Sequence, residues 1–180
     1  NGVVYTGRMD QEIPEYLPVR SVEPEDGSSG AKIILLIDRS KSFGGNRFGA
    51  VDQTNQSQKS VRIASGIVED SAGSNRVGVV DYAKEARLIR EPKSVMFNRQ
   101  DLLAGIAGIE PALQASYHDL GLRGAAQLAS ENDTIVMLSD GKIGSYSRSN
   151  IAFKTRSEAN AMESRLITVG LGDNPNRPLL

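Results

Sequence analysis

The sequence predicts a single α/β domain in which helices cover both faces of a mostly parallel sheet that has one antiparallel edge strand. Two observations predict this three-layer sandwich. Runs of β-branched and leucine residues alternate along the chain with segments whose apolar residues recur at helical spacing. The strand-like runs are also apolar on both faces, as in buried strands of parallel sheets. A length of 180 residues suits one well-buried domain and not two.

Residues 1–30 differ in composition from the rest, and we expect them to form an arm or linker before a domain at 31–180. Residues 2–9 (GVVYTGRM) favour a short strand, which we expect to pair at a sheet edge. Residues 12–30 contain three prolines, several acids and the run Gly27-Ser28-Ser29-Gly30, which is linker composition.

The first strand and helix of the domain follow Lys32. The apolar run 33–37 (IILLI) ends abruptly at Asp38 and predicts a strand buried on both faces. After a glycine-containing loop, residues 55–70 predict a helix. Its apolar residues are three and four positions apart: Val61, Ala64, Ile67 and Val68.

The next two strands are joined by a connection too short for a helix. Residues 76–82 (RVGVVDY) predict a second buried strand, and residues 86–90 predict a strand that returns beside it. Only Lys84 and Glu85 form the polar connection, so this pair must be antiparallel.

The last part of the chain continues the alternation. Residues 100–109 predict a short helix that ends before Pro111, and residues 119–130 predict another, with Asp119 suited to its N-terminus. The remaining predicted elements are a strand at 134–138 (TIVML), a helix that includes 157–162 and a strand at 166–171 (LITVGL).

Composition excludes several classes of function. The formal net charge of −1 argues against a nucleic-acid binder and against electrostatic docking onto a membrane. The absence of cysteine excludes disulfides, thiolate metal sites and cysteine nucleophiles. No apolar stretch approaches the ~20 residues that span a bilayer, so we expect no membrane insertion by this segment. The chain begins with Asn1 and shows no signal peptide, which we take as the mark of a piece of a longer protein.

Two predicted strands end in carboxylates at the same edge of the sheet. Asp38 follows the first strand and Asp140 follows the strand at 134–138. Ligand sites in such sheets gather at the carboxyl ends of the strands. Ser40 and Ser42 add hydroxyls at alternate positions after Asp38, and hard cations such as Mg²⁺ take oxygen ligands. Two neighbouring carboxylates also favour a positive charge between them.

These segments resemble the von Willebrand factor A family, whose fold is a Rossmann-like α/β sandwich. IDRSKS resembles the family's DxSxS element, LSDG resembles its strand-end aspartate turn, and the order of elements over residues 31–173 agrees. The resemblance implies a metal-ion-dependent adhesion site. In such a site Ser40 and Ser42 would bind the ion directly, Asp38 and Asp140 would hold it directly or through water, and an acidic side chain of a protein partner would complete its coordination. Such domains are recognition modules and not enzymes.

The chain departs from the family pattern at two positions. His118 stands where the family has a threonine, with Ser116 as an alternative two residues earlier. An imidazole ligand would shift the preference from Mg²⁺, Mn²⁺ or Ca²⁺ towards a softer divalent ion. Lys41 stands where the family favours glycine, and we expect Lys41 and Arg39 to lie in solvent.

The leading hypothesis is a divalent-metal-dependent adhesion or assembly module within a larger surface or secreted protein, extracytoplasmic and not cytoplasmic. From the resemblance, we expect the domain at 31–180 to lack the family's last helix. One alternative is a Mg²⁺-dependent phosphohydrolase with Asp38 as the nucleophile, although such enzymes generally place a second acid where Ser40 stands. The other is a metal-free scaffold in which Asp38 and the serines cap a helix and Asp140 belongs to an Asp-Gly turn.

Overall fold

The computed structural model describes residues 4–5, 30–40, 56–112, 114–142 and 148–171. Within these residues six strands form one sheet in the order β1-β6-β5-β2-β3-β4. All neighbouring strands are parallel except the edge pair β3 and β4. The strands are β1 (Val4–Tyr5), β2 (Lys32–Asp38), β3 (Arg76–Tyr82), β4 (Ala86–Ser94), β5 (Thr134–Ser139) and β6 (Arg165–Gly170).

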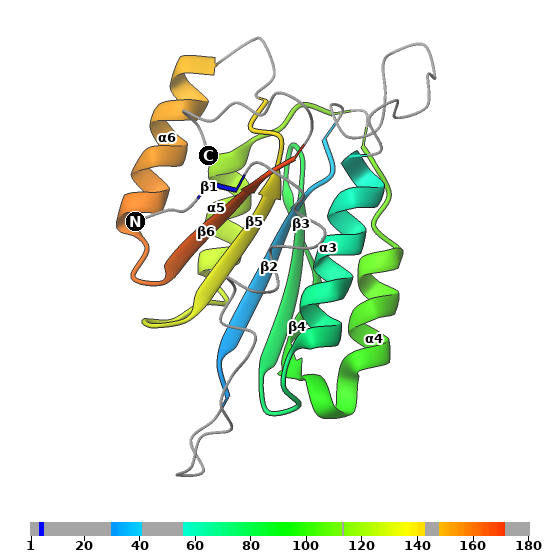
Figure 1. Ribbon diagram of the computed structural model, residues 1–180. Coiled ribbons are helices and arrows are strands. Elements are labelled where there is room, and N and C mark those ends of the chain that lie inside the picture. Colours follow the sequence, from blue (N-terminus) through cyan, green and yellow to red (C-terminus); the bar gives the residue numbers. More distant parts are fainter. Residues whose placement is uncertain (1–3, 6–29, 41–55, 113, 143–147, 172–180) are drawn as a thin grey trace.

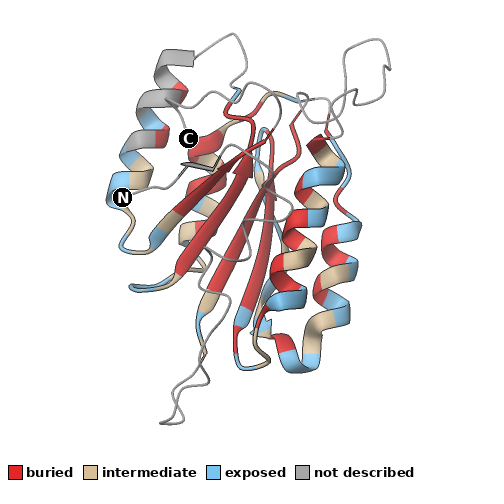
Figure 2. Cartoon of the chain, viewed as in Figure 1, coloured by how far each residue is buried: buried red, intermediate tan, exposed pale blue. Residues whose placement is uncertain are grey.

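In the described part of the chain, four helices cover the two faces of this sheet (Figure 1). They are α3 (Gln56–Asp70), α4 (Val95–Ala107), α5 (His118–Ala126) and α6 (Arg148–Ala161). Odd-numbered residues of β2 pack with apolar residues of α3 and α4, and its even-numbered apolar residues pack with α5 and the end of α6. This alternation follows from the two-residue period of a strand. The central strands are therefore buried on both sides (Figure 2), and the predicted α/β sandwich is confirmed.

The helices and strands predicted from the sequence are present. Their observed ends differ most from the predicted ends at the edge strand and next to turns. β4 continues to Ser94, beyond the expected end at Arg90. It passes through Pro92 with irregular pairing to β3, which an edge strand tolerates. α4 consequently begins at Val95 and not at residue 100. α5 ends at Ala126, four residues early, and α6 begins at Arg148, well before the segment expected.

The N-terminal arm contributes to the sheet at one point. Val4 and Tyr5 pair in parallel with Thr168 and Val169 of β6, so the edge pairing expected of residues 2–9 is seen at these two residues. The rest of the arm lies outside the described residues. No helix in the described part of the chain is both long and apolar enough to span a bilayer.

Register brings the ends of three central strands together. Asp38 at the end of β2 is level with Tyr82 at the end of β3. Ile37 is level with Leu138, so that Ser139 and Asp140 follow at the same edge. The carboxyl edge of the sheet therefore presents several polar side chains from separate parts of the sequence.

Helix α5 approaches this edge closely because it carries glycine where it crosses β3. A Cβ atom at Gly121 would lie 2.6 Å from Cγ of the Tyr82 ring, which is closer than two carbon atoms can pack. By contrast, nothing lies within 4 Å of a Cβ atom at Gly66 in α3. Gly121 thus sets the distance between α5 and Tyr82.

We predict opposite effects for the two glycine-to-alanine substitutions. Gly121→Ala should lower the free energy of unfolding by about 1–3 kcal/mol because the ring and the helix must move apart. Gly66→Ala should raise it by about 0.5–1 kcal/mol, since alanine favours a helix and meets no neighbour. Urea unfolding of both variants measures this, and equal effects at the two positions would contradict the close approach of α5.

Candidate functional site

Asp38 lies at the centre of the carboxyl edge and is almost fully buried, with 1% of its surface exposed. Its Oδ1 accepts the backbone N–H of Ser40 at 2.9 Å. Its Oδ2 accepts three hydroxyl hydrogen bonds: Ser139 Oγ at 2.8 Å, Ser116 Oγ at 3.1 Å and Tyr82 Oη at 3.2 Å. Burial raises the pKa of Asp38, and the hydrogen bonds from Ser40, Ser139 and Ser116 oppose that rise.

The three hydroxyl donors come from separate elements. Tyr82 ends β3, Ser139 ends β5, and Ser116 lies in the segment before α5. Backbone hydrogen bonds hold that segment against the sheet. Tyr117 N donates to Ala83 O at 2.9 Å, and Ala112 N donates to Arg39 O at 2.6 Å.

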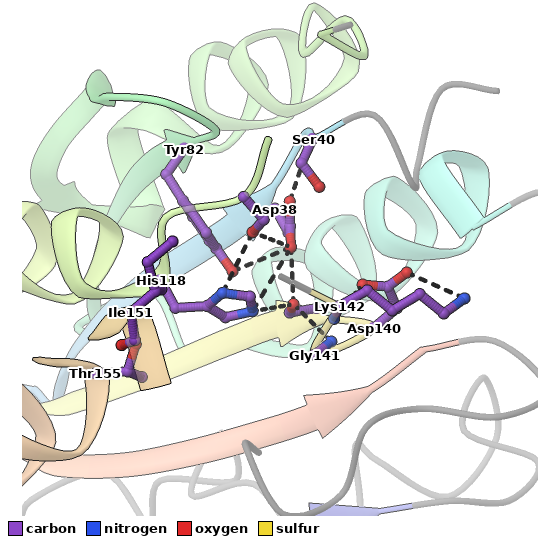
Figure 3. A network of polar contacts seen from close by, with 11 residues as sticks. Asp38, Ser40, Tyr82, His118, Asp140, Gly141, Lys142, Ile151 and Thr155 are labelled. Carbon is purple, nitrogen blue, oxygen red and sulfur yellow. Dashed lines mark hydrogen bonds and ion pairs between the residues drawn. The ribbon is translucent and has the colours of Figure 1, made fainter. Parts of the chain in front are cut away.

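His118, the first residue of α5, completes this group. Its Nε2 lies 3.0 Å from Ser139 Oγ, and its Nδ1 lies 3.3 Å from Ser116 Oγ. Its ring also meets the Tyr82 ring edge-on, with centroids 5.6 Å apart. Burial lowers the pKa of His118 to about 4, although the charges of Asp140 and Asp119 oppose this, so the ring is neutral at pH 7. We call Asp38, Tyr82, Ser116, His118 and Ser139 the Asp38 network (Figure 3).

Asp140 lies at the same edge, and Figure 3 shows it on the side of Asp38 away from His118. Its side chain is buried, and its Oδ1 accepts the backbone N–H of Lys142 at 2.9 Å. Its Oδ2 lies 3.4 Å from Lys142 Nζ, in an ion pair whose lysine side chain is half exposed. Gly141 turns the chain here with a φ of 69°, a conformation that favours glycine, and its N–H donates to Ser139 Oγ at 3.0 Å.

The structure brings most of the predicted site residues to one place. Asp38, Ser40 and His118 lie together, and Asp140 follows directly after a residue of the Asp38 network. Ser42 lies outside the described residues.

Sequence reasoning missed Tyr82 and Ser139. Both are the last residues of buried strands, and a polar residue that ends an apolar strand was the signal that could have identified them.

The expectation that Arg39 lies in solvent is wrong. Its side chain is buried, and its Nε lies 3.1 Å from Oδ1 of the fully buried Asp81. Arg87 also pairs with Asp81, through Nε at 2.8 Å and Nη2 at 2.5 Å. The buried carboxylate of Asp81, the penultimate residue of β3, thus holds the side chain of Arg39, which lies between Asp38 and Ser40 in the sequence. Lys41 lies outside the described residues.

The chemistry of the donor set fits a hard divalent cation. Asp38, Asp140, Ser40 and Ser116 are buried and supply carboxylate and hydroxyl oxygens, the ligands that Mg²⁺ and Ca²⁺ prefer. Asp119, which is also buried, adds negative charge near His118, and its Oδ1 has no hydrogen-bond partner among the described residues. Within the same residues no three acid or imidazole side chains converge closely enough to hold a metal ion. Serine hydroxyls would therefore be needed.

A family model described as the von Willebrand factor type A domain matches residues 33–142, which is more than half of the chain. No curated protein sequence matches this chain significantly.

Solved structures share the fold at low sequence identity. An aerotolerance-related membrane protein from Bacteroides fragilis is 17% identical, with a TM-score of 0.60 over 79% of this chain and 68% of the other. Proximal thread matrix protein 1 from the mussel byssus is 18% identical, with a TM-score of 0.59 over 82% and 39%. The type V pili tip protein Mfa5 from Porphyromonas gingivalis is 17% identical, with a TM-score of 0.52 over 63% and 20%.

Proposed function

The chain belongs to the von Willebrand factor type A domain family, and from this premise we propose that it is a divalent-cation-dependent module for protein recognition in adhesion or assembly. The observation that carries the proposal is the convergence of buried oxygen atoms at the carboxyl edge. Asp38 and Asp140 are both almost fully buried there beside serine hydroxyls. Buried carboxylates are costly unless a positive charge or hydrogen bonds compensate them.

The proposed ligands are Asp38, Ser40, Ser116 and Asp140, together with Ser42 on the strength of the family resemblance. A bound Mg²⁺, Mn²⁺ or Ca²⁺ would supply a coordination position that an acidic side chain of a protein partner can fill. We leave His118 out of the ligand set because each of its ring nitrogens lies within hydrogen-bond distance of a serine hydroxyl. The donor set thus favours a hard ion over a softer one.

Adhesion or assembly outside the cytoplasm suits the proteins that share the fold. One is a pilus tip protein, one is a thread matrix protein of the byssus, and one is a membrane protein. At 17–18% identity these proteins share the fold with this chain. The surface location and the acidic partner are part of our proposal.

The surroundings of Asp38 argue against a phosphohydrolase. A nucleophilic carboxylate needs an oxygen that faces the substrate. Oδ2 of Asp38 instead accepts three hydroxyl hydrogen bonds, and the residue is 1% exposed. Hydrolysis of a phosphoester by the wild type, lost in Asp38→Asn, would favour the enzyme.

A metal-free scaffold is the second candidate, and one observation favours it. The hydrogen bonds of Asp38 and the ion pair between Asp140 and Lys142 give both carboxylates partners within the chain. In that case the edge would be a structural network that fixes the strand ends.

We predict that Mg²⁺ or Mn²⁺ binds the wild type with measurable heat and that Asp38→Asn weakens this binding at least tenfold, because the amide removes the central negative charge. Isothermal titration calorimetry measures both. Asp70→Asn removes an exposed charge at the end of α3 and serves as the matched control. The metal-free scaffold is favoured if the wild type gives no heat, provided that a thermal melt shows a folded protein.

We predict that Lys142→Gln tightens Mn²⁺ binding roughly fivefold, since the ammonium competes with the ion for Asp140 and a partly exposed pair contributes about 1 kcal/mol or less. Lys93→Gln makes the same change of net charge at an exposed position near the opposite end of the sheet. Equal affinities of the two variants would show that Lys142 does not compete for the site.

A further inference from the structure

The hydrogen bonds of Ser139 determine which nitrogen of His118 carries the proton. Ser139 Oγ has one proton and three neighbours: Asp38 Oδ2, the Gly141 N–H and His118 Nε2. A carboxylate oxygen only accepts and a backbone N–H only donates. The Ser139 proton therefore points to Asp38 at 2.8 Å, which leaves the oxygen to accept a hydrogen bond from His118 Nε2. If the Ser139 proton pointed to His118 Nε2 instead, lone pairs of Ser139 Oγ and Asp38 Oδ2 would face each other at 2.8 Å.

Ionised Asp38 is the premise of this assignment, and its contacts support it. Oδ1 faces the backbone N–H of Ser40, and Oδ2 faces three hydroxyl groups. Each of these groups can donate a hydrogen bond, and a charged acceptor forms the strongest bonds with them.

Ser116 differs from Ser139 because its proton has two alternative acceptors. Its Oγ lies 3.1 Å from Asp38 Oδ2 and 3.3 Å from His118 Nδ1. With the proton of the neutral ring on Nε2, Nδ1 offers a lone pair. The Ser116 hydroxyl can consequently turn from Asp38 to His118 without leaving either buried group without a donor, since Asp38 keeps its other donors.

We propose that His118 is a positioning residue for Ser116: fixed by Ser139 as the Nε2–H tautomer, its Nδ1 accepts a hydrogen bond from the Ser116 hydroxyl when a divalent cation occupies the Asp38 site. This inference rests on the proposed function. The Ser116 oxygen then turns lone pairs away from the ring and towards the cation. His118 itself does not bind the ion. Its hydrogen bond orients the Ser116 hydroxyl, as the hydrogen-bonded neighbour of a metal ligand orients that ligand.

The geometry of α5 explains why a ring is needed here. His118 is fully buried, and its two nitrogens reach hydroxyls on two elements, Ser116 before α5 and Ser139 at the end of β5. A shorter side chain can form a hydrogen bond with only one of these two hydroxyls. Asparagine places an amide near the position of Nδ1 and can accept from Ser116, whereas leucine fills a similar volume and accepts from neither.

The first test is nitrogen NMR of the cation-free wild type. The chain has a single histidine, so its ring signals need no assignment by mutation. Long-range ¹⁵N–¹H correlation at pH 7 should show a protonated Nε2 and an unprotonated Nδ1. A protonated Nδ1 with an unprotonated Nε2 would overturn the inference. The pattern should persist when Mg²⁺ is added, with the largest shift at Nδ1.

The second test is a double-mutant cycle on Mn²⁺ affinity. His118→Leu and Ser116→Ala should each weaken binding roughly tenfold, and the double variant should be no weaker than either, because both remove the same ligand. His118→Asn should retain most of the affinity. Thermal melts report folding, and His118→Asn provides a second variant if His118→Leu does not fold.

The outcomes separate this inference from the proposed function. If the wild type binds no cation, both fail. If the wild type binds Mn²⁺ but His118→Leu binds equally well, or if the two losses are additive, the positioning role alone fails. A direct ligand role for His118 would appear as a loss of the unprotonated Nδ1 signal pattern on addition of Mg²⁺ and would overturn the inference too.

Discussion

A buried carboxylate has to be surrounded by hydrogen-bond donors, and for Asp38 these donors come from four separate segments of the chain. The Ser40 backbone, Tyr82, Ser116 and Ser139 all donate to it. An unsatisfied buried charge costs several kcal/mol, so the segments that carry these donors must keep their relative positions. The close packing of Gly121 against Tyr82 brings the start of α5 within reach. One carboxylate thus links the ends of β2, β3 and β5 to α5.

Hydrogen bonds satisfy both carboxylate oxygens of Asp38 but do not remove the negative charge of this edge. Hydroxyl groups are neutral, and His118 is neutral because burial lowers its pKa to about 4. Lys142 pairs with Asp140 from a half-exposed position, and Arg39 is held by Asp81. A cation at this edge is therefore favoured by electrostatics. Whether the site has such an ion or uses its hydroxyls alone distinguishes a recognition module from a scaffold.

Much of the fold could be predicted because its core strands are uninterrupted apolar runs that end in polar residues. The strand at 33–37 and the strand at 76–82 were located to within a residue or two for this reason. The extension of β4 through Pro92 and the early start of α4 were missed, since tertiary pairing overrides local propensity at an edge. At the site, Asp38 and Asp140 were found from strand ends. Tyr82 and Ser139 also end apolar strands, but they were missed because a hydroxyl at a strand end is a weaker signal of a site than a carboxylate. The role of His118 depends on contacts that only the packing of α5 creates.

The proposed recognition through this edge requires a cation bound among its oxygens, and a crystal structure with Mn²⁺ tests that proposal directly. Anomalous scattering identifies the ion without assumptions about its ligands. We expect one strong peak at the carboxyl edge, within bonding distance of a serine hydroxyl and next to the carboxylates of Asp38 and Asp140. An ordered site with no anomalous peak, in which Asp38 keeps all three hydroxyl hydrogen bonds at saturating Mn²⁺, would contradict the proposal that a cation binds here.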